Sequence, residues 1–184
     1  LRFSNLCNMK CVMCGPQYSS LWYEDYTKLH NTDTFTVGSK EYKIYKDNGV
    51  YKSNTPKWHD TPEWWDQFHR IKQHVRHIYL TGGEPLLRPD IVEIVDRIAG
   101  LANAPRLTLT TNGLKLKELA LPLAKAGLNR INVSLDTLSR ERFKKLTYRD
   151  RFDDVIEGLH AAKAAGLFPI KVNTVLLQGI NDDE

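Results

Sequence analysis

Long apolar runs are missing from this sequence of 184 residues. A helix that spans a membrane needs about 18 consecutive apolar residues or more, and no stretch approaches that length. The chain does not open on a signal peptide either. Neither sign of charge dominates, because 26 Lys and Arg stand against 22 Asp and Glu, for a net charge of +4. We therefore expect no membrane partner and no nucleic-acid partner, while the mild positive charge suits small anions.

Cysteine is scarce, and its few copies are clustered. The chain has three cysteines, Cys7, Cys11 and Cys14, at C-x₃-C-x₂-C spacing. A disulfide framework favours an even number, whereas such tight spacing suits ligands that converge on one centre. Three thiolates are one short of a closed zinc site, which remains an alternative. A [4Fe–4S] cluster with one open iron fits better, and free cysteines without a secretion signal indicate a reducing cytoplasm.

Strands and helices alternate along most of the chain, as judged from hydrophobic periodicity. We expect strands at 1–6, 78–80, 107–111, 130–136 and 170–177. We expect helices at 91–99 after Asp90, at 115–126, in a short stretch after Ser139, and at 152–165. This order predicts an α/β fold with about five parallel strands joined by right-handed βαβ units.

The predicted strands have one apolar face and one polar face. In 130–136, for example, Ile131 and Val133 alternate with Asn132 and Ser134. A parallel strand covered on both faces is normally apolar throughout, so the polar faces need another explanation. If the sheet curls into a barrel, they line its lumen, and functional groups gather at the C-terminal ends of the strands. An open sheet with one wet face is the alternative.

Residues 31–60 differ from the rest of the chain in their residue pattern. They alternate polar and aromatic residues around glycine turns, which predicts a small aromatic β-rich insertion. We treat residues 1–184 as one core domain that contains this insertion. The chain starts inside a predicted strand and stops in a polar turn, so we expect it to be truncated at both ends.

The second expected strand ends at Thr81-Gly82-Gly83-Glu84-Pro85. Two adjacent glycines let a ligand approach the backbone closely. Pro85 restricts Glu84 to an extended conformation and so directs its carboxylate. A directed carboxylate beside bare backbone would suit a ligand ammonium group.

Together, the pattern C-N-x-x-C-x-x-C and the turn T-G-G-E-P resemble the radical S-adenosylmethionine (SAM) superfamily. From about Leu80 onward, Thr110-Thr111-Asn112-Gly113, Asn132-Val133-Ser134-Leu135-Asp136 and the stretch from Lys171 to Glu184 resemble the GTP 3′,8-cyclase family of molybdenum-cofactor biosynthesis. The resemblance implies a partial (β/α)₆ barrel. The segment from Arg2 to Pro16 instead resembles radical SAM proteins with a shortened C-terminal "twitch" extension.

The resemblance also implies roles for individual residues. Three irons of a [4Fe–4S] cluster would be bound by Cys7, Cys11 and Cys14. SAM would chelate the fourth iron and would be contacted by Gly82, Gly83, Glu84, Ser134 and Met13. Thr110 and Lys171 would face a GTP substrate. An ammonium in a barrel lumen is costly unless an anion meets it, and either a substrate phosphate or an internal carboxylate would serve for Lys171.

The implied activity is reductive cleavage of SAM to a 5′-deoxyadenosyl radical, fed by an external electron donor, followed by cyclisation of GTP. One alternative is a twitch-type radical SAM enzyme that modifies a peptide or another small molecule. A second alternative is a non-catalytic zinc or nucleic-acid-binding module.

Overall fold

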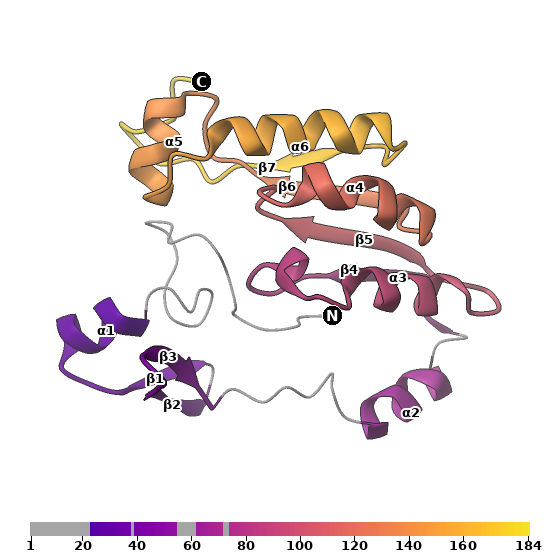
Figure 1. Ribbon diagram of the computed structural model, residues 1–184, viewed down its shortest axis with the longest axis horizontal. Coiled ribbons are helices and arrows are strands. Elements are labelled where there is room, and N and C mark those ends of the chain that lie inside the picture. The colour runs from indigo at the N-terminus through magenta and orange to yellow at the C-terminus, as the bar shows by residue number, and fades with distance from the viewer. Residues whose placement is uncertain (1–22, 38, 55–61, 72–73) are drawn as a thin grey trace.

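The structure is a computed structural model that describes residues 23–37, 39–54, 62–71 and 74–184. The expected first strand at 1–6, the three cysteines and Met13 lie outside these residues. Figure 1 shows a parallel sheet with helices packed along it, together with a second, smaller sheet near the N-terminal end of the described chain.

The larger sheet has the order β4-β5-β6-β7, and all three pairings are parallel. Its strands are β4 (His77–Leu80), β5 (Arg106–Thr111), β6 (Arg130–Ser134) and β7 (Lys171–Asn173). The α/β class and the parallel sheet are thus confirmed, with four of the five expected strands among the described residues. The last strand is shorter than the predicted 170–177, because the chain turns away after Asn173.

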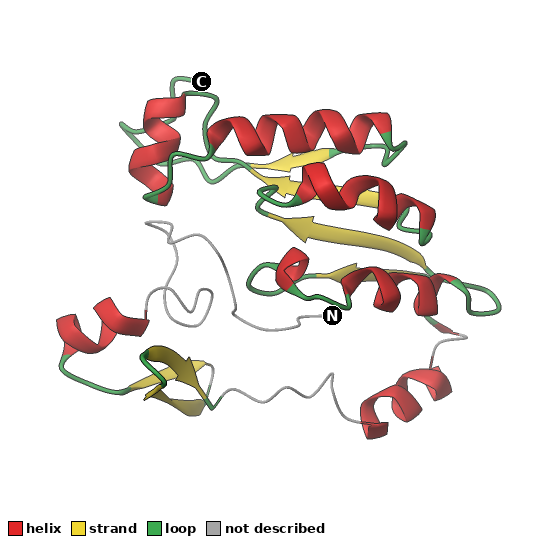
Figure 2. Cartoon of the chain, in the orientation of Figure 1, coloured by secondary structure: helices red, strands yellow, loops and turns green. Residues whose placement is uncertain are grey.

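Helices cover one face of this sheet, as Figure 2 shows in red against the yellow strands. They are the 3₁₀ turn η4 (Pro85–Leu87) and the α-helices α3 (Ile91–Ala99), α4 (Leu116–Lys125), α5 (Arg140–Thr147) and α6 (Phe152–Ala164). The apolar side chains of the strands point to this layer: Leu80, Leu109 and Ile131 are fully buried in one core with Val95 and Leu123 of the helices. Burial of this shared surface drives the packing of helices on the sheet.

The helix signals in the sequence were mostly correct. The range of α3 matches the predicted 91–99, and Ser139 caps α5 by accepting a hydrogen bond from the Arg142 backbone N–H. Asp90 precedes α3 as predicted, but its side chain makes no capping hydrogen bond. Its carboxylate instead accepts two hydrogen bonds from the Arg88 guanidinium, at 2.6 and 2.8 Å, because a charged donor competes successfully with the backbone.

The smaller sheet is antiparallel in the order β1-β2-β3, with strands at Thr34–Val37, Lys40–Asp47 and Val50–Ser53. It packs with α1 (Tyr23–His30) around a separate core of Tyr23, Phe35 and Ile44. The helix α2 (Pro62–Ile71) follows it in the chain. The expected β-rich character of residues 31–60 is therefore seen in the described part of that range.

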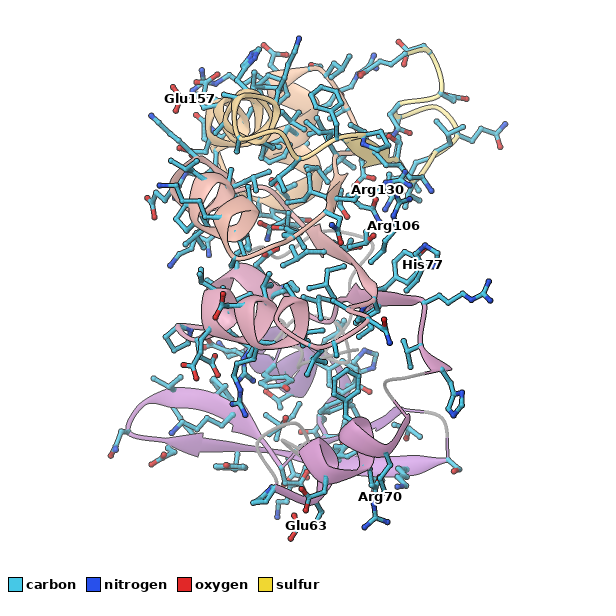
Figure 3. All side chains as sticks on the ribbon, turned by 90° about the vertical axis from the view of Figure 1, so that its right-hand side faces the viewer. Glu63, Arg70, His77, Arg106, Arg130 and Glu157 are labelled. Carbon is cyan, nitrogen blue, oxygen red and sulfur yellow. The ribbon has the colours of Figure 1, made fainter. Side chains whose placement is uncertain are left out.

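The N-terminal and C-terminal ends of the strands in the larger sheet carry different kinds of residues. His77, Arg106 and Arg130 stand at the N-terminal ends of β4, β5 and β6, and Figure 3 shows them following one edge. The candidate functional residues lie toward the opposite, C-terminal edge. In the described part of the chain, no helix has both the length and the apolar character needed to cross a membrane.

Helices α4 and α6 approach each other closely at Gly158. A Cβ at this position would lie 2.8 Å from the Gly113 carbonyl oxygen and 2.9 Å from the Leu116 Cβ. Both distances are shorter than real Cβ contacts allow. Glycine at 158 therefore lets α6 rest against the loop that leads from β5 into α4.

We predict that Gly158→Ala destabilises the protein although alanine is the better helix former. The helix would gain about 1 kcal/mol, but crowding against backbone costs about 1–3 kcal/mol. We expect a net fall of about 1 kcal/mol in the free energy of unfolding, measured by urea denaturation. Lys163→Ala, an exposed change on the same helix, is the control and should stay within about 0.5 kcal/mol. An unchanged or raised stability for Gly158→Ala would contradict the close contact.

Candidate functional site

The turn after β4 exposes backbone at the C-terminal edge of the sheet. Gly82 and Gly83 have φ angles of 110° and 42°, a region that residues with a side chain rarely adopt. Both glycines are half-buried, with no Cβ between their peptide groups and a ligand. Glu84 has the extended conformation predicted from Pro85, with φ −127° and ψ 103°. The sequence therefore predicted the extended conformation of Glu84 correctly.

The Glu84 side chain points into the protein and joins two strand ends. Its Oε1 accepts hydrogen bonds from the Thr111 hydroxyl at 2.6 Å and from the Leu86 N–H at 3.0 Å. Its Oε2 accepts from the Asn112 N–H at 2.7 Å. The residue is only 3% exposed. Its carboxylate thus holds the turn after β4 against the end of β5, and the adjacent glycine backbone is the part of the turn best placed to meet a ligand.

Thr111 and Asn112 extend this connection into the next loop. The Thr111 hydroxyl also accepts a hydrogen bond from the Gly113 N–H at 3.0 Å, and the Asn112 side chain accepts from the Leu114 N–H at 3.1 Å. Sequence reasoning did not assign a role to either residue. The only signal was the polar pair at the end of an apolar strand, which says nothing of a partner 27 residues away.

Burial and hydrogen bonding shift the pKa of Glu84 in opposite directions. Loss of water raises the pKa of its carboxyl above the ordinary value, and the hydrogen bonds from Asn112, Thr111 and Leu86 work against that rise. The burial effect is the larger, so the pKa of Glu84 is raised overall.

A row of polar side chains crosses the face of the sheet that the helices do not cover. Thr110 of β5, Asn132 of β6 and Lys171 of β7 are register partners on adjacent parallel strands. The Asn132 amide donates a hydrogen bond to the Thr110 hydroxyl at 3.3 Å. Lys171 is exposed, and no carboxylate in the described part of the chain pairs with its ammonium. Of the two anions considered for Lys171, a substrate phosphate or an internal carboxylate, the second is thus not found among the described residues.

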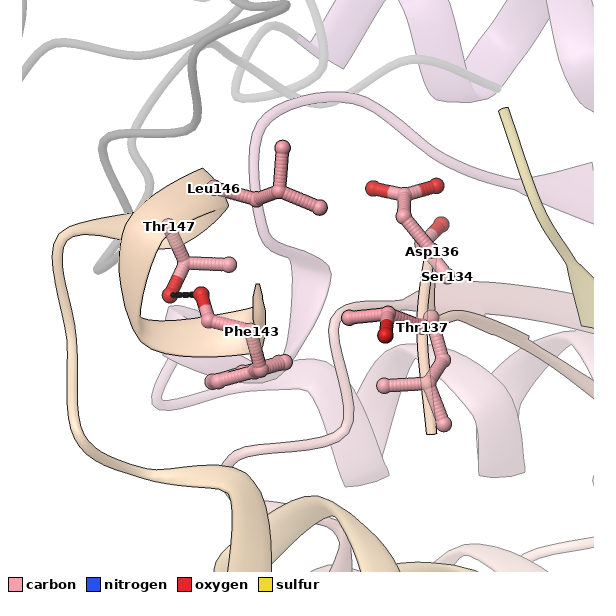
Figure 4. A pocket seen from close by; sticks show the side chains of 7 residues that line it. Ser134, Asp136, Thr137, Phe143, Leu146 and Thr147 are labelled. Atoms are coloured by element: carbon pink, nitrogen blue, oxygen red, sulfur yellow. Dashed lines mark hydrogen bonds between the residues drawn. The ribbon is translucent and has the colours of Figure 1, made fainter. Parts of the chain in front are cut away.

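Ser134 ends β6 and borders a small pocket. Residues 134–137 line one side of this pocket, and Phe143, Leu146 and Thr147 of α5 line the other (Figure 4). The Thr147 hydroxyl donates to the Phe143 carbonyl at 2.7 Å, which the dashed line in Figure 4 marks. Asp136 accepts a hydrogen bond from the Val175 N–H at 2.9 Å, and partial burial raises the pKa of its carboxyl.

The C-terminal segment is tied to the same pocket. Glu184 accepts hydrogen bonds from the Thr137 hydroxyl and the Leu138 N–H, both at 2.6 Å, and from the Arg142 guanidinium at 2.7 Å. Asn181 is 1% exposed, and its amide donates to the Val175 carbonyl at 2.9 Å and to the Asp136 carbonyl. These contacts hold the chain after β7 over the end of β6.

The structure therefore collects most of the described candidates at one edge and one face of the sheet. Gly82, Gly83 and Glu84 lie at the end of β4, Ser134 lies at the end of β6, and Thr110 and Lys171 lie on the uncovered face. No cluster of metal-binding side chains occurs among the described residues.

The profile of the Radical SAM superfamily matches residues 1–184. The chain belongs to the radical SAM superfamily. Radical SAM enzymes use a [4Fe–4S] cluster and SAM, so these are the cofactors of its family. Membership confirms the predicted superfamily and favours an enzyme over a zinc or nucleic-acid-binding module.

Curated relatives within the superfamily are named GTP 3′,8-cyclase. The relative from Listeria monocytogenes (strain EGD-e) is 46% identical over 97% of this chain and 45% of its own length. The relative from Thermodesulfovibrio yellowstonii is 38% identical over 97% of this chain and 47% of its own length. The relative from Streptomyces coelicolor is 57% identical over 60% of this chain and 32% of its own length. The chain thus spans about half the length, or less, of these relatives.

Solved structures confirm the fold. HydG, a maturase of the [FeFe]-hydrogenase, superposes with a TM-score of 0.58 and 16% identity, over 95% of this chain and 34% of its own. TYW1 with a lysine-pyruvate adduct bound gives a TM-score of 0.52 and 16% identity, over 96% and 54%. The parallel sheet of this radical SAM chain is therefore part of the expected partial (β/α)₆ barrel.

We predict that Thr111→Val weakens both the fold and SAM cleavage. The change removes a donor to Glu84 and leaves the Gly113 N–H without its acceptor, which costs about 1–3 kcal/mol of unfolding free energy. The glycine turn would lose its fixed position, so 5′-deoxyadenosine should form more slowly in the reconstituted enzyme. Thr111→Ser keeps the hydroxyl and should restore both properties. A valine variant as stable and active as wild type would contradict the role of the hydroxyl.

Glu84→Gln tests the titration of the buried carboxyl. Because the native pKa is raised, the native state keeps its proton at pH values where the unfolded chain has lost it. The stability that this proton gives is fully present below the ordinary pKa of 4.5 and is lost as the pH rises through the native pKa. Glutamine does not titrate, so the stability of wild type relative to Glu84→Gln should fall as the pH rises above 4.5. Urea unfolding of both proteins at several pH values measures this difference, and a constant difference would reject the shift.

Proposed function

We propose that this chain is the SAM-binding core of a GTP 3′,8-cyclase, a lyase of molybdenum-cofactor biosynthesis. The observation that carries the proposal is the match to relatives of that name over 97% of the chain, at 38% and 46% identity. The likeness therefore extends through the N-terminal part, where the sequence also resembled twitch-type proteins. No described residue favours the twitch-type alternative.

The cofactor site is assigned from donor chemistry and from the turn after β4. Thiolates are the ligands that iron–sulfur clusters prefer, and Cys7, Cys11 and Cys14 supply three. Gly82 and Gly83 fit the amino acid part of SAM, since their backbone is free of side chains at the edge of the sheet. Glu84 acts in this assignment mainly by holding that backbone in place.

Two further residues complete the proposed SAM site. Ser134 ends β6, and the glycine turn follows the C-terminal end of β4 in the same parallel sheet, which supports a contact between its hydroxyl and SAM. Met13 precedes the last cysteine, and its flexible thioether would pack beneath the adenine.

The substrate assignment rests on the polar row of the uncovered face. Lys171 presents an ammonium with no carboxylate partner in the described chain, which suits the phosphates of GTP. Thr110 lies in the same row, two strands away, and its hydroxyl is within reach of a ligand that spans the row. The phosphates would thus lie toward β7.

The bound cofactors supply a 5′-deoxyadenosyl radical, for which an electron donor outside the chain, in a reducing cytoplasm, is needed. The residues of this chain would hold GTP with its ribose toward the bound SAM and with the sugar carbon facing the guanine. It also excludes water and competing hydrogen donors from the lumen.

Anaerobic reconstitution tests the proposal directly. We expect the protein to bind about four irons and, with a reductant, to cleave SAM to 5′-deoxyadenosine and convert GTP to its 3′,8-cyclic product. Cys11→Ala should abolish cluster binding. SAM cleavage without any reaction of GTP would leave the superfamily chemistry intact and reject the cyclase assignment.

We predict that Lys171→Ala lowers the affinity for GTP about tenfold or more, because a charged hydrogen bond to phosphate is lost. Cleavage of SAM should continue, since Lys171 lies on a different strand from the proposed SAM contacts. Equilibrium dialysis with GTP and assay of 5′-deoxyadenosine measure the two effects. Lys163→Ala, on the outer face of α6, removes the same charge and should change neither. Unchanged GTP affinity in Lys171→Ala would reject the substrate role.

A further inference from the structure

Asn132 has one buried polar atom without a hydrogen-bond partner in the part of the chain that the structure describes. Its side chain lies in the middle of β6 and is 9% exposed. The amide nitrogen donates to the Thr110 hydroxyl at 3.3 Å. The other end of the amide, Oδ1, is buried and has no hydrogen-bond partner. Since buried acceptors are nearly always paired, this atom indicates a ligand that supplies a donor.

The surroundings of Asn132 restrict what that ligand group can be. Thr110 and Lys171 are its register partners on either side, so all three side chains leave the same face of the sheet. Adjacent strands lie about 4.8 Å apart, which is less than the length of a nucleotide. A ligand with its phosphates at Lys171 therefore extends over Asn132.

Only a hydrogen-bond donor of the nucleotide can pair with the Asn132 Oδ1, which is an acceptor. Ionised phosphate oxygens only accept hydrogen bonds, so they cannot pair with an acceptor. The donors of a guanine nucleotide are its ribose hydroxyls and the N–H groups on the base. The ribose is bonded to the α-phosphate, so a nucleotide whose α-phosphate meets Lys171 would bring its ribose toward Asn132 on the neighbouring strand.

We propose that Asn132 is a substrate-positioning residue whose Oδ1 accepts a hydrogen bond from a ribose hydroxyl of the nucleotide. This inference rests on the proposed function and deepens it, because the ribose is also where the hydrogen is removed. Asn132 orients the sugar, while Lys171 binds the phosphates.

The test compares nucleotide binding by wild type and by Asn132→Leu, which keeps the size of the side chain but has no acceptor. Equilibrium dialysis is run with GTP, 2′-deoxy-GTP, 3′-deoxy-GTP and inosine triphosphate, which lacks the amino group of guanine. We expect wild type to bind GTP about tenfold more tightly than one of the two deoxy analogues. The leucine variant should bind GTP about tenfold more weakly and should lose that preference.

Asn132→Asp retains an oxygen acceptor and should keep the preference for the hydroxyl, so it decides the question if the leucine variant does not fold. A preference for the hydroxyl that persists in Asn132→Leu, or is lost in Asn132→Asp, would overturn the proposal. A preference for GTP over inosine triphosphate that disappears in Asn132→Leu would overturn the assignment to the sugar in favour of the base.

The same experiment separates this inference from the proposed function. If wild type cleaves SAM but does not bind GTP, the cyclase assignment fails, and the role of Asn132 toward this nucleotide fails with it. If wild type binds GTP and the leucine variant retains full discrimination, only the role of Asn132 fails.

Discussion

A buried carboxylate holds the candidate site together. Glu84 follows the glycine turn of β4 and receives donors from the end of β5 and from η4. Parallel strands are joined only by long crossovers, so the chain connection alone does not fix the position of one strand end relative to the next. The Glu84 hydrogen bonds supply that constraint. A ligand that contacts the Gly82-Gly83 backbone therefore contacts a surface whose position depends on β5 as well.

The face of the sheet that the helices do not cover carries polar side chains for a different reason. The apolar side chains of β5 and β6 are used in packing against the helices, so the alternate positions remain for polar residues. Thr110 and Asn132 hydrogen-bond to each other, and Lys171 continues their row without a carboxylate partner in the described chain. Such a face is costly for a structural sheet but appropriate for a lumen that receives a charged substrate.

The sequence predicted the elements of the fold better than the contacts of the site. Helix 91–99, the Ser139 cap and the parallel strands follow from local periodicity and end signals, and the structure confirms them. The same local signals placed Asp90 at the N-cap of α3, where the structure has it, but its carboxylate accepts from Arg88 and makes no capping hydrogen bond. The partners of Glu84 could not be predicted, since hydrogen bonds between residues 27 or 28 positions apart depend on strand register. The roles of the three cysteines stay predictions.

The glycine at the contact of α4 and α6 has a consequence for how this sequence can change. Gly158 lies against Gly113, and Gly113 donates its N–H to the threonine that binds Glu84. A short chain of contacts thus connects the outer helix layer to the glycine turn after β4. A larger residue at 158 would crowd the Gly113 carbonyl and Leu116, and so would move the loop beneath it. A glycine on an outer helix is therefore tied through Gly113 and Thr111 to the position of the turn after β4.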